Sequence, residues 1–187
     1  MNTDAADAPR AFREVLRGIH DARVRGDITL VEVPAPSRIA PYAVALTGEI
    51  ELDGESAASG RFVVLHDPAG QEAWDGTLRI IALVKAEVEL EVGGDDLWAQ
   101  AAWSWIHDAL EGIPHRALGG TVTRTTNESF GELADRGREV VVEMRVSWTP
   151  LDTDIAPHLA AWADLLGSCA GVPPLPEGVT MLPGKTA

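Results

Sequence analysis

A regular alternation of apolar and polar residues between positions 77 and 92 is the clearest pattern in this chain. Every even position from 78 to 92 is apolar. Because successive side chains of a β-strand point to opposite faces of a sheet, these positions predict one continuous buried face. Among the odd positions, Ile81 and Leu83 are apolar, whereas the four that follow are charged. We therefore expect a strand that is covered on both faces in its first half and on one face in its second half.

Shorter segments rich in β-branched and aromatic residues predict the remaining strands. These strands are expected at residues 28–33, 42–52, 61–66, 120–126 and 138–148. The prolines between residues 34 and 41 indicate a rigid connection, and residues 67–76 are typical of a hairpin loop.

Apolar residues at helical spacing predict three helices, over residues 9–25, 97–110 and about 155–166. The last of these helices is expected to turn Leu159 and Trp162 inward, together with Leu166. The predicted N-caps are Asp7, either Asp95 or Asp96, and Asp154.

The predicted order of elements is one helix, several strands, a helix, two strands and a final helix. Short turns between successive strands favour antiparallel pairing. The sequence therefore predicts a single α+β domain over residues 1–172, with an antiparallel sheet of five to six strands and three helices packed on it. Residues 173–187 contain four prolines and are expected to form an extended tail.

The helix predicted at residues 97–110 carries three tryptophans and an apolar arc of about 200°, wider than a one-sided helix needs. Trp98 and Trp105 fall in one stripe with alanines and are expected to pack in the core. Trp103 lies at the edge of the arc beside His107 and requires a second surface. This surface is another helix of the chain, a partner such as a second copy, or a stacked ligand. The candidate partner-binding residues here are Trp103, Ile106, His107 and Leu110.

Two groups of charged residues are also candidate surfaces. Arg10, Arg13 and Arg17 form a basic stripe on the first helix, which is expected to pair with acids of the same chain or to be solvated, and which is also a candidate for partner binding. An acidic patch or a solvated sheet face is expected where outward-pointing glutamates gather on two strands. These glutamates are Glu49, Glu51, Glu87, Glu89 and Glu91.

Composition and charge narrow the classes of partner. The 187 residues are 45% hydrophobic and 24% charged, which is typical of a globular domain. The formal net charge of −14 repels phosphate backbones, so nucleic acid is not an expected partner. We also expect no membrane span and no secretory signal, because charged residues interrupt every apolar run and the N-terminal segment is acidic. The single cysteine, Cys169, fits a reducing cytoplasm.

The sequence lacks the motifs of several common active sites. It contains no Gly-x-Ser-x-Gly elbow, phosphate loop, dinucleotide-binding turn or His-Glu-x-x-His pattern. No two of the five histidines have close metal-ligand spacing on one element, so neither a metal nor a cofactor is expected. Cys169 is expected to be a packed apolar residue and not a nucleophile.

One hairpin provides an alternative, enzymatic hypothesis. His66 and Asp67 end one predicted strand, and Trp74 and Asp75 begin the next. A hairpin brings such ends together, so an acid–base pair beside an aromatic ring is geometrically feasible. The simpler interpretation is that these residues form the turn and pack across the strands.

Several segments resemble one known family over nearly the whole chain. These segments are VPAPSRIAPYAVAL, GRFVVLHDPAGQEAWDGTLRI, WSWIHDAL, GTVTRTTNESFG, SWTP and PPLPEGV. They are similar to an actinobacterial family of cytoplasmic proteins known as domain of unknown function 3000. The resemblance implies no activity, cofactor or catalytic residue.

The order of elements is also similar to that of type III secretion chaperones and YbjN-like proteins. Proteins with those folds bind other proteins and commonly dimerise through the middle helix, which corresponds to residues 96–111 here. By this fold-level analogy we expect a non-catalytic protein-binding module, chaperone-like or adaptor-like, with a homodimer as its form of self-association. The alternatives are the hairpin enzyme and a small-ligand carrier with a dry cavity between sheet and helices.

Overall fold

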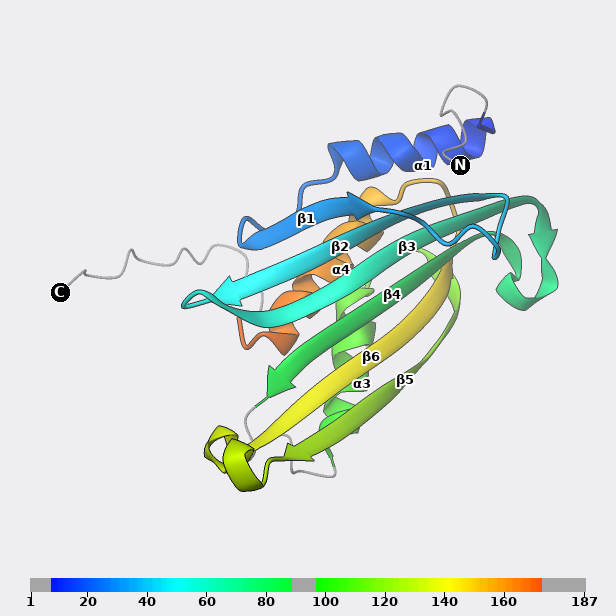
Figure 1. The fold of residues 1–187 in the computed structure, drawn as a ribbon. Coiled ribbons are helices and arrows are strands. Elements are labelled where there is room, and N and C mark those ends of the chain that lie inside the picture. Colours follow the sequence, from blue (N-terminus) through cyan, green and yellow to red (C-terminus); the bar gives the residue numbers. More distant parts are fainter. Residues whose placement is uncertain (1–7, 89–96, 173–187) are drawn as a thin grey trace.

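The computed structural model describes residues 8–88 and 97–172 (Figure 1). The elements are α1 (Arg10–Asp21), β1 (Ile28–Val33), β2 (Tyr42–Leu52), β3 (Glu55–Gln71), η1 (Glu72–Trp74), β4 (Gly76–Val88), α3 (Trp98–Ala109), β5 (His115–Glu128), η2 (Gly131–Arg136), β6 (Arg138–Pro150) and α4 (Ala156–Cys169). Several predictions lie outside the described residues, namely the caps Asp7, Asp95 and Asp96, the strand positions 89–92 and the tail 173–187.

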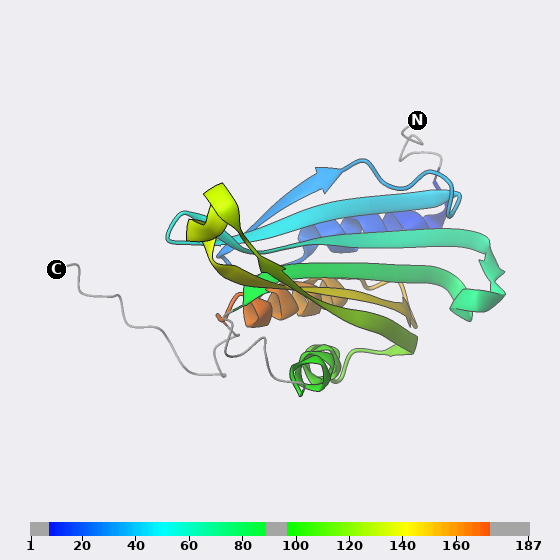
Figure 2. The same cartoon turned by 60° about the horizontal axis from the view of Figure 1, so that its bottom comes forward.

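The six strands of the described residues form one antiparallel sheet in the order β1-β2-β3-β4-β6-β5. The three α-helices of residues 8–88 and 97–172 contribute to a single core on one face of this sheet, and Figure 2 shows α3 and α4 on the same side of it. Figure 1 looks onto the opposite face, which we call the open face. The predicted α+β class, strand number and order of elements are confirmed.

Burial along β4 follows the predicted alternation. Its even positions from Leu78 to Ala86 are at most 5% exposed and point toward the helices, whereas Lys85 and Glu87 are exposed on the open face. Ile81 and Leu83 also point to the open face, but they are half-buried. The first half of the strand is therefore covered on both faces more fully than the second, as predicted.

The helix α1 ends at Asp21, four residues before the predicted end, because Arg25 is drawn toward α4. The backbone becomes extended at Ala22. Arg25 then donates two hydrogen bonds to the carboxylate of Asp27, at 2.6 and 2.7 Å, and a third to the carbonyl of Val172 at 2.7 Å. A long-range contact with the end of α4 thus ends α1.

The helix α4 buries Leu159, Trp162 and Leu166, as predicted, and continues to Cys169, beyond the predicted end. Its predicted cap was wrong. Ile155 occupies the N-cap position and no side chain caps the helix. Asp154 does not cap it because it lies one residue earlier, where its backbone N–H donates to the carboxylate of Asp152 at 2.9 Å.

Three of the predicted strands are longer than expected. The segment predicted as a strand at 61–66 belongs to β3, which begins at Glu55 and continues through part of the predicted hairpin loop to Gln71. The two strands after α3 each gain residues at their ends. Pairing with neighbouring strands supplies hydrogen bonds that the local sequence does not signal.

Candidate binding surface

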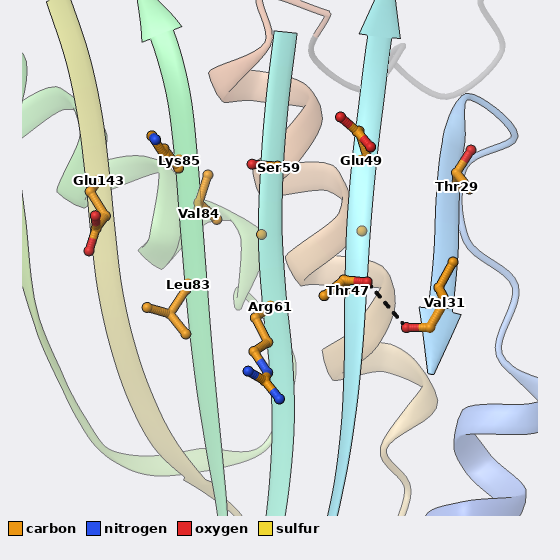
Figure 3. A pocket seen from close by; sticks show the side chains of 12 residues that line it. Thr29, Val31, Thr47, Glu49, Ser59, Arg61, Leu83, Val84, Lys85 and Glu143 are labelled. Carbon is orange, nitrogen blue, oxygen red and sulfur yellow. Dashed lines mark hydrogen bonds between the residues drawn. The ribbon is translucent and has the colours of Figure 1, made fainter. Parts of the chain in front are cut away.

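The open face of the sheet contains a hollow of about 410 Å³, which we call the sheet hollow (Figure 3). It spans the strands β1, β2, β3, β4 and β6. The residues that line it are Thr29, Val31, Thr47, Gly48, Glu49, Ser59, Gly60, Arg61, Leu83, Val84, Lys85 and Glu143. Polar, apolar and charged groups of both signs are therefore available to one ligand.

Strand register arranges these side chains in two rows across the sheet. One row runs from Glu49 through Ser59 and Lys85 to Glu143, and the next runs from Val31 through Thr47 and Arg61 to Leu83. Cross-strand neighbours on one face lie about 5 Å apart at their Cβ atoms. Thr47 and Ser59, in the middle of the hollow, have short side chains. The side chains around them in Figure 3 are longer.

The backbone under the hollow is pressed against α4 on the other face. A Cβ atom on Gly60 would lie 2.3 Å from the Leu83 carbonyl oxygen and 3.0 Å from the Trp162 ring, and one on Gly48 would lie 2.7 Å from the same ring. Gly48 and Gly60 are paired across β2 and β3. Because both lack a side chain, Trp162 can approach the sheet closely at this point.

Residues 34–41, which we call the proline segment, cover the open face next to the hollow. In Figure 1 they cross in front of β2 and β3. Ala35 and Ala40 pack against a small apolar cluster on this face. Arg61 donates to the carbonyl of Pro34 at 2.5 Å, and Gln71 donates to that of Ile39 at 3.3 Å. Side chains of the open face therefore hold a connecting segment that contains bends, by its backbone carbonyl groups. The buried residues of the apolar cluster are Ala45, Val63, Leu65 and Trp74.

The charges in the sheet hollow balance, although the chain as a whole is strongly acidic. Arg61 and Lys85 share the lining with Glu49 and Glu143. Glu143 accepts a hydrogen bond from Arg145 at 2.5 Å. The predicted acidic patch is therefore interrupted by cations, because Glu49 and the exposed Glu87 share the face with Arg61 and Lys85. Glu89 and Glu91 lie outside the described residues.

Comparison with known proteins gives one match. A family model described as a protein of unknown function (DUF3000) matches residues 8–180. The chain belongs to the DUF3000 family. The match contains every described helix and strand and both faces of the sheet. No curated protein and no solved structure matches the chain.

In this DUF3000 protein, the residues of the predicted hairpin site point to different sides of the sheet. The His66 ring faces the helices, stacked on Phe12 at 6.2 Å between ring centroids, and its Nδ1 lies 3.0 Å from the Thr77 carbonyl oxygen. Trp74 is buried in the apolar cluster of the open face. The histidine and the tryptophan are therefore separated by the thickness of the sheet.

The two aspartates of that hairpin have local roles. Asp67 accepts hydrogen bonds from the backbone N–H of Ala69 at 3.0 Å and from Gln71 at 3.1 Å. Asp75 adopts a left-handed backbone conformation, with φ of 52°, and forms an exposed ion pair with Arg116 at 3.2 Å. In the part of the chain that the structure describes, the four hairpin residues do not converge on one cavity.

The buried stripe of α3 lies one position away from the predicted one. It consists of Trp98, Ala102, Ile106 and Leu110. Trp105 is half-buried and meets Trp98 edge to face, with 5.8 Å between ring centroids. Trp105 packs against the core, as expected, but it is only partly buried, because α4 packs beside α3 and turns Ile106 and Leu110 inward. A gap of only about 10 Å³ remains between these two helices, too small for a ligand.

Trp103, at the other margin of α3, finds its second surface partly within the chain. It is half-buried over β5, where a Cβ on Gly120 would lie 3.2 Å from its ring. Its ring meets the exposed His107 edge to face at 5.6 Å between centroids. Ile106 and Leu110 are buried in the chain's own core and offer no surface to a partner.

The arginines of α1 make short-range contacts. Arg10 pairs with Glu14 at 2.9 Å, and this hydrogen bond, with a second from Thr153, lowers the pKa of the Glu14 carboxyl. Arg13 donates to the carbonyl of Ala8. Arg17 is exposed. The stripe thus pairs in part with the chain itself, as expected.

Two groups with reactive side chains are shielded in the core. Burial raises the pKa of the Cys169 thiol to about 12. Burial likewise lowers the pKa of His158 to about 4, and its neutral ring accepts a hydrogen bond from the Trp148 indole at 3.0 Å.

Within the described residues, no group of three or more His, Cys, Asp or Glu side chains is placed to hold a metal ion. No helix in the same residues combines the length and apolar character of a membrane span.

Sequence reasoning did not identify the sheet hollow. One signal was available at Gly48, which lies inside the strand predicted at 42–52, since an isolated glycine in a strand often marks a close approach of another group. Gly60 lies just before the strand predicted at 61–66 and gave no such signal. The signal does not say which group approaches or which residues share the opposite face.

Proposed function

We propose that this protein is a non-catalytic binding module that holds an extended segment of a partner protein on the open face of its sheet. The observation that carries this proposal is the proline segment. The open face already holds one segment of the chain that lies outside any helix or strand, using Arg61 and Gln71 to bind its backbone carbonyls. The sheet hollow continues this surface and is free of any such cover among the described residues.

The lining of the sheet hollow suits a polypeptide. Thr29 and Ser59 offer hydroxyl groups for backbone hydrogen bonds, and Val31 and Leu83 offer apolar contact. Val31 is 53% exposed, so a ligand that covers it removes apolar surface from water. The balanced charges favour a segment of mixed composition over a polyanion.

The same lining gives little support to catalysis. It contains no histidine and no cysteine. Its two carboxylates, Glu49 and Glu143, stand on β2 and β6 with two strands between them. Acid–base catalysis needs groups within hydrogen-bond reach of one reacting atom. The likeness to secretion chaperones that the sequence led us to expect is an analogy at the level of the fold, and it agrees with protein binding.

Selection from a library of random peptides tests this proposal directly. Peptides of about twelve residues are long enough to cross the whole sheet in an extended form. We expect selected peptides to bind the wild type and to lose at least tenfold in affinity on Leu83→Asp, which places a charge in the hollow. The matched control is Leu151→Asp, at a leucine that is 55% exposed elsewhere on the surface.

Equal binding to both variants would place the peptide site elsewhere and would contradict the proposal. Failure to select any peptide that binds above background would contradict it as well. Circular dichroism and urea denaturation of both variants confirm that a loss of binding is not a loss of folding.

A further inference from the structure

Most arginines with side-chain contacts in the described residues have a carboxylate partner. Five form ion pairs or hydrogen bonds with an aspartate or glutamate of the chain. They are Arg10, Arg25, Arg116, Arg138 and Arg145. In a chain with 29 acidic residues against 15 basic ones, such pairing is expected.

Arg61 is an exception. Its guanidinium donates to the neutral carbonyl of Pro34, and its Nε is buried without a hydrogen-bond partner. Its two cross-strand neighbours are Thr47 on β2 and Leu83 on β4, neither of which carries charge. In Figure 3 the guanidinium also points away from Glu49. Arg61 is thus held in place by the proline segment while its charge has no carboxylate partner among the described residues.

Lys85 is a second cation in the same situation. It is the only lysine of the described residues, and it is exposed at the rim of the sheet hollow. Its cross-strand neighbours are Ser59 and Glu143. The Glu143 carboxylate accepts from Arg145, and no ion pair within the described residues includes Lys85. Its ammonium group is therefore available to a ligand.

We propose that the ligand segment places one acidic side chain in the sheet hollow, between Arg61 and Lys85. This inference rests on the proposed peptide-binding function. The two residues are diagonal neighbours on β3 and β4, about 7–8 Å apart. In Figure 3 their charged ends point in opposite directions, with Arg61 held by Pro34, so the exposed Lys85 side chain turns toward Arg61 when both contact one carboxylate. Leu83 stands beside both of them, and it favours an apolar residue next to the acidic one in the ligand.

The remaining charges of the hollow select a carboxylate over a phosphate. Glu49 and Glu143 lie on the rim, on either side of the two cations. One carboxylate neutralises part of the local positive charge without strong repulsion from these glutamates. A phosphorylated side chain carries nearly twice the negative charge and meets more repulsion from the same groups.

The test uses peptides selected on the wild-type protein. We expect these peptides to be enriched in Asp or Glu at one position, and replacement of that residue by its amide to weaken binding about tenfold. Arg61→Gln and Lys85→Gln should each weaken binding by a similar factor. Arg10→Gln is the control, since Arg10 lies exposed on α1 and pairs with Glu14.

Reversal of the charge at Lys85 distinguishes a direct ion pair with the ligand from a long-range electrostatic effect of the whole protein. Lys85→Glu should abolish binding of the acidic peptide, and a peptide with Lys in place of its acidic residue should recover at least tenfold on this variant. Because Lys85 is exposed, this variant is expected to fold even if Arg61→Gln loosens the proline segment.

The outcomes separate this inference from the proposed function. Peptides that bind at the hollow, as shown by their loss on Leu83→Asp, but that change less than twofold on neutralisation of their acidic residue would overturn the acidic specificity alone. Tighter binding of a phosphoserine peptide than of the matching glutamate peptide would overturn the choice of carboxylate. Absence of any peptide binding would overturn both proposals.

Discussion

The indole N–H of Trp162 donates to the backbone carbonyl of Leu83 at 3.1 Å, on the side of the sheet opposite the hollow that the Leu83 side chain lines. Leu83 therefore contacts α4 through its backbone carbonyl and lines the candidate binding surface with its side chain. The close approach of Trp162 depends on Gly48 and Gly60, which lie under its ring. Packing of α4 thereby fixes the shape of the floor of the sheet hollow.

Replacement of Gly60 by alanine tests this close approach. The added Cβ would meet the Leu83 carbonyl oxygen at 2.3 Å, a distance that requires the backbone of β3 or β4 to shift. We expect Gly60→Ala to lower the free energy of unfolding by about 3 kcal/mol. Gly119→Ala on β5 is the matched control, because a Cβ there meets nothing within 4 Å. Urea denaturation of both variants provides the measurement, and equal stability of the two would refute the tight packing.

Another glycine, Gly167 on α4, provides a second test of stability. The effect of Gly167→Ala on the free energy of unfolding should change sign when Arg25 is absent. A Cβ on Gly167 would lie 1.5 Å from Nη1 of Arg25, so Gly167→Ala should displace this arginine from Asp27 and Val172 and lower stability by about 1–2 kcal/mol. In an Arg25→Ala background the same change should raise stability by up to about 1 kcal/mol, because alanine is the better helix former.

A double-mutant cycle measured by urea denaturation checks the coupling between Arg25 and Gly167. If the effect of Gly167→Ala has the same sign and size in both backgrounds, the contact contributes nothing to the end of α4.

The buried His158 predicts a loss of stability in acid. Its folded-state pKa of about 4 lies below its ordinary value of 6.5, so the unfolded state takes up the proton first as the pH falls. The stability is therefore fully present above pH 6.5 and declines toward pH 4. Between pH 7.5 and pH 4.5 we expect this group to cost about 2–3 kcal/mol.

The measurement compares the wild type with His158→Gln, whose amide oxygen can still accept from the Trp148 indole. The stability lost between the two pH values should be smaller for the variant by that amount. Identical losses would mean that the histidine does not stay neutral in the fold.

The alternation along β4 predicts opposite results at adjacent positions. Val84 is 2% exposed on the helix face, and Lys85 is exposed on the open face. Val84→Asp buries an unpaired charge and should prevent folding, whereas Lys85→Asp should change stability by less than about 1 kcal/mol. Circular dichroism and thermal denaturation distinguish the two, and a folded Val84→Asp would show that the strand is misassigned.

The sequence is sufficient to predict the elements whose side chains alternate between two different environments. The buried face of β4 has a period of two over many residues, which few other structures can produce. The ends of β3 are not predictable in this way, because Ser56, Ala57 and Gly60 have no strong strand preference. They join the sheet because β2 and β4 supply hydrogen-bond partners on both sides.

Contacts between distant segments explain the other differences. The local sequence predicts a helix through Arg25, but the backbone is extended from Ala22 and Arg25 contacts the end of α4 instead. The wide apolar arc of α3 leaves its rotation undetermined, and packing against α4 selects Ile106 over Trp105 as the buried residue.

The sheet hollow could not be predicted for the same reason. It depends on the register that sets Thr47 beside Arg61 and Ser59 beside Lys85, and several registers are compatible with these strand sequences. Where each charged residue of the hollow lies follows from strand pairing, which the one-dimensional pattern does not contain.

Filling the sheet hollow tests the central claim most directly. Ser59 lies in the middle of the hollow, so Ser59→Trp should occupy it, and Thr125→Trp adds the same side chain at an exposed position of β5 outside it. Calorimetric titration of each folded variant with a peptide selected on the wild type gives the comparison. We predict at least a tenfold loss of affinity for Ser59→Trp and less than a twofold change for Thr125→Trp. Wild-type affinity in the filled variant would contradict the assignment of the open face as the binding surface.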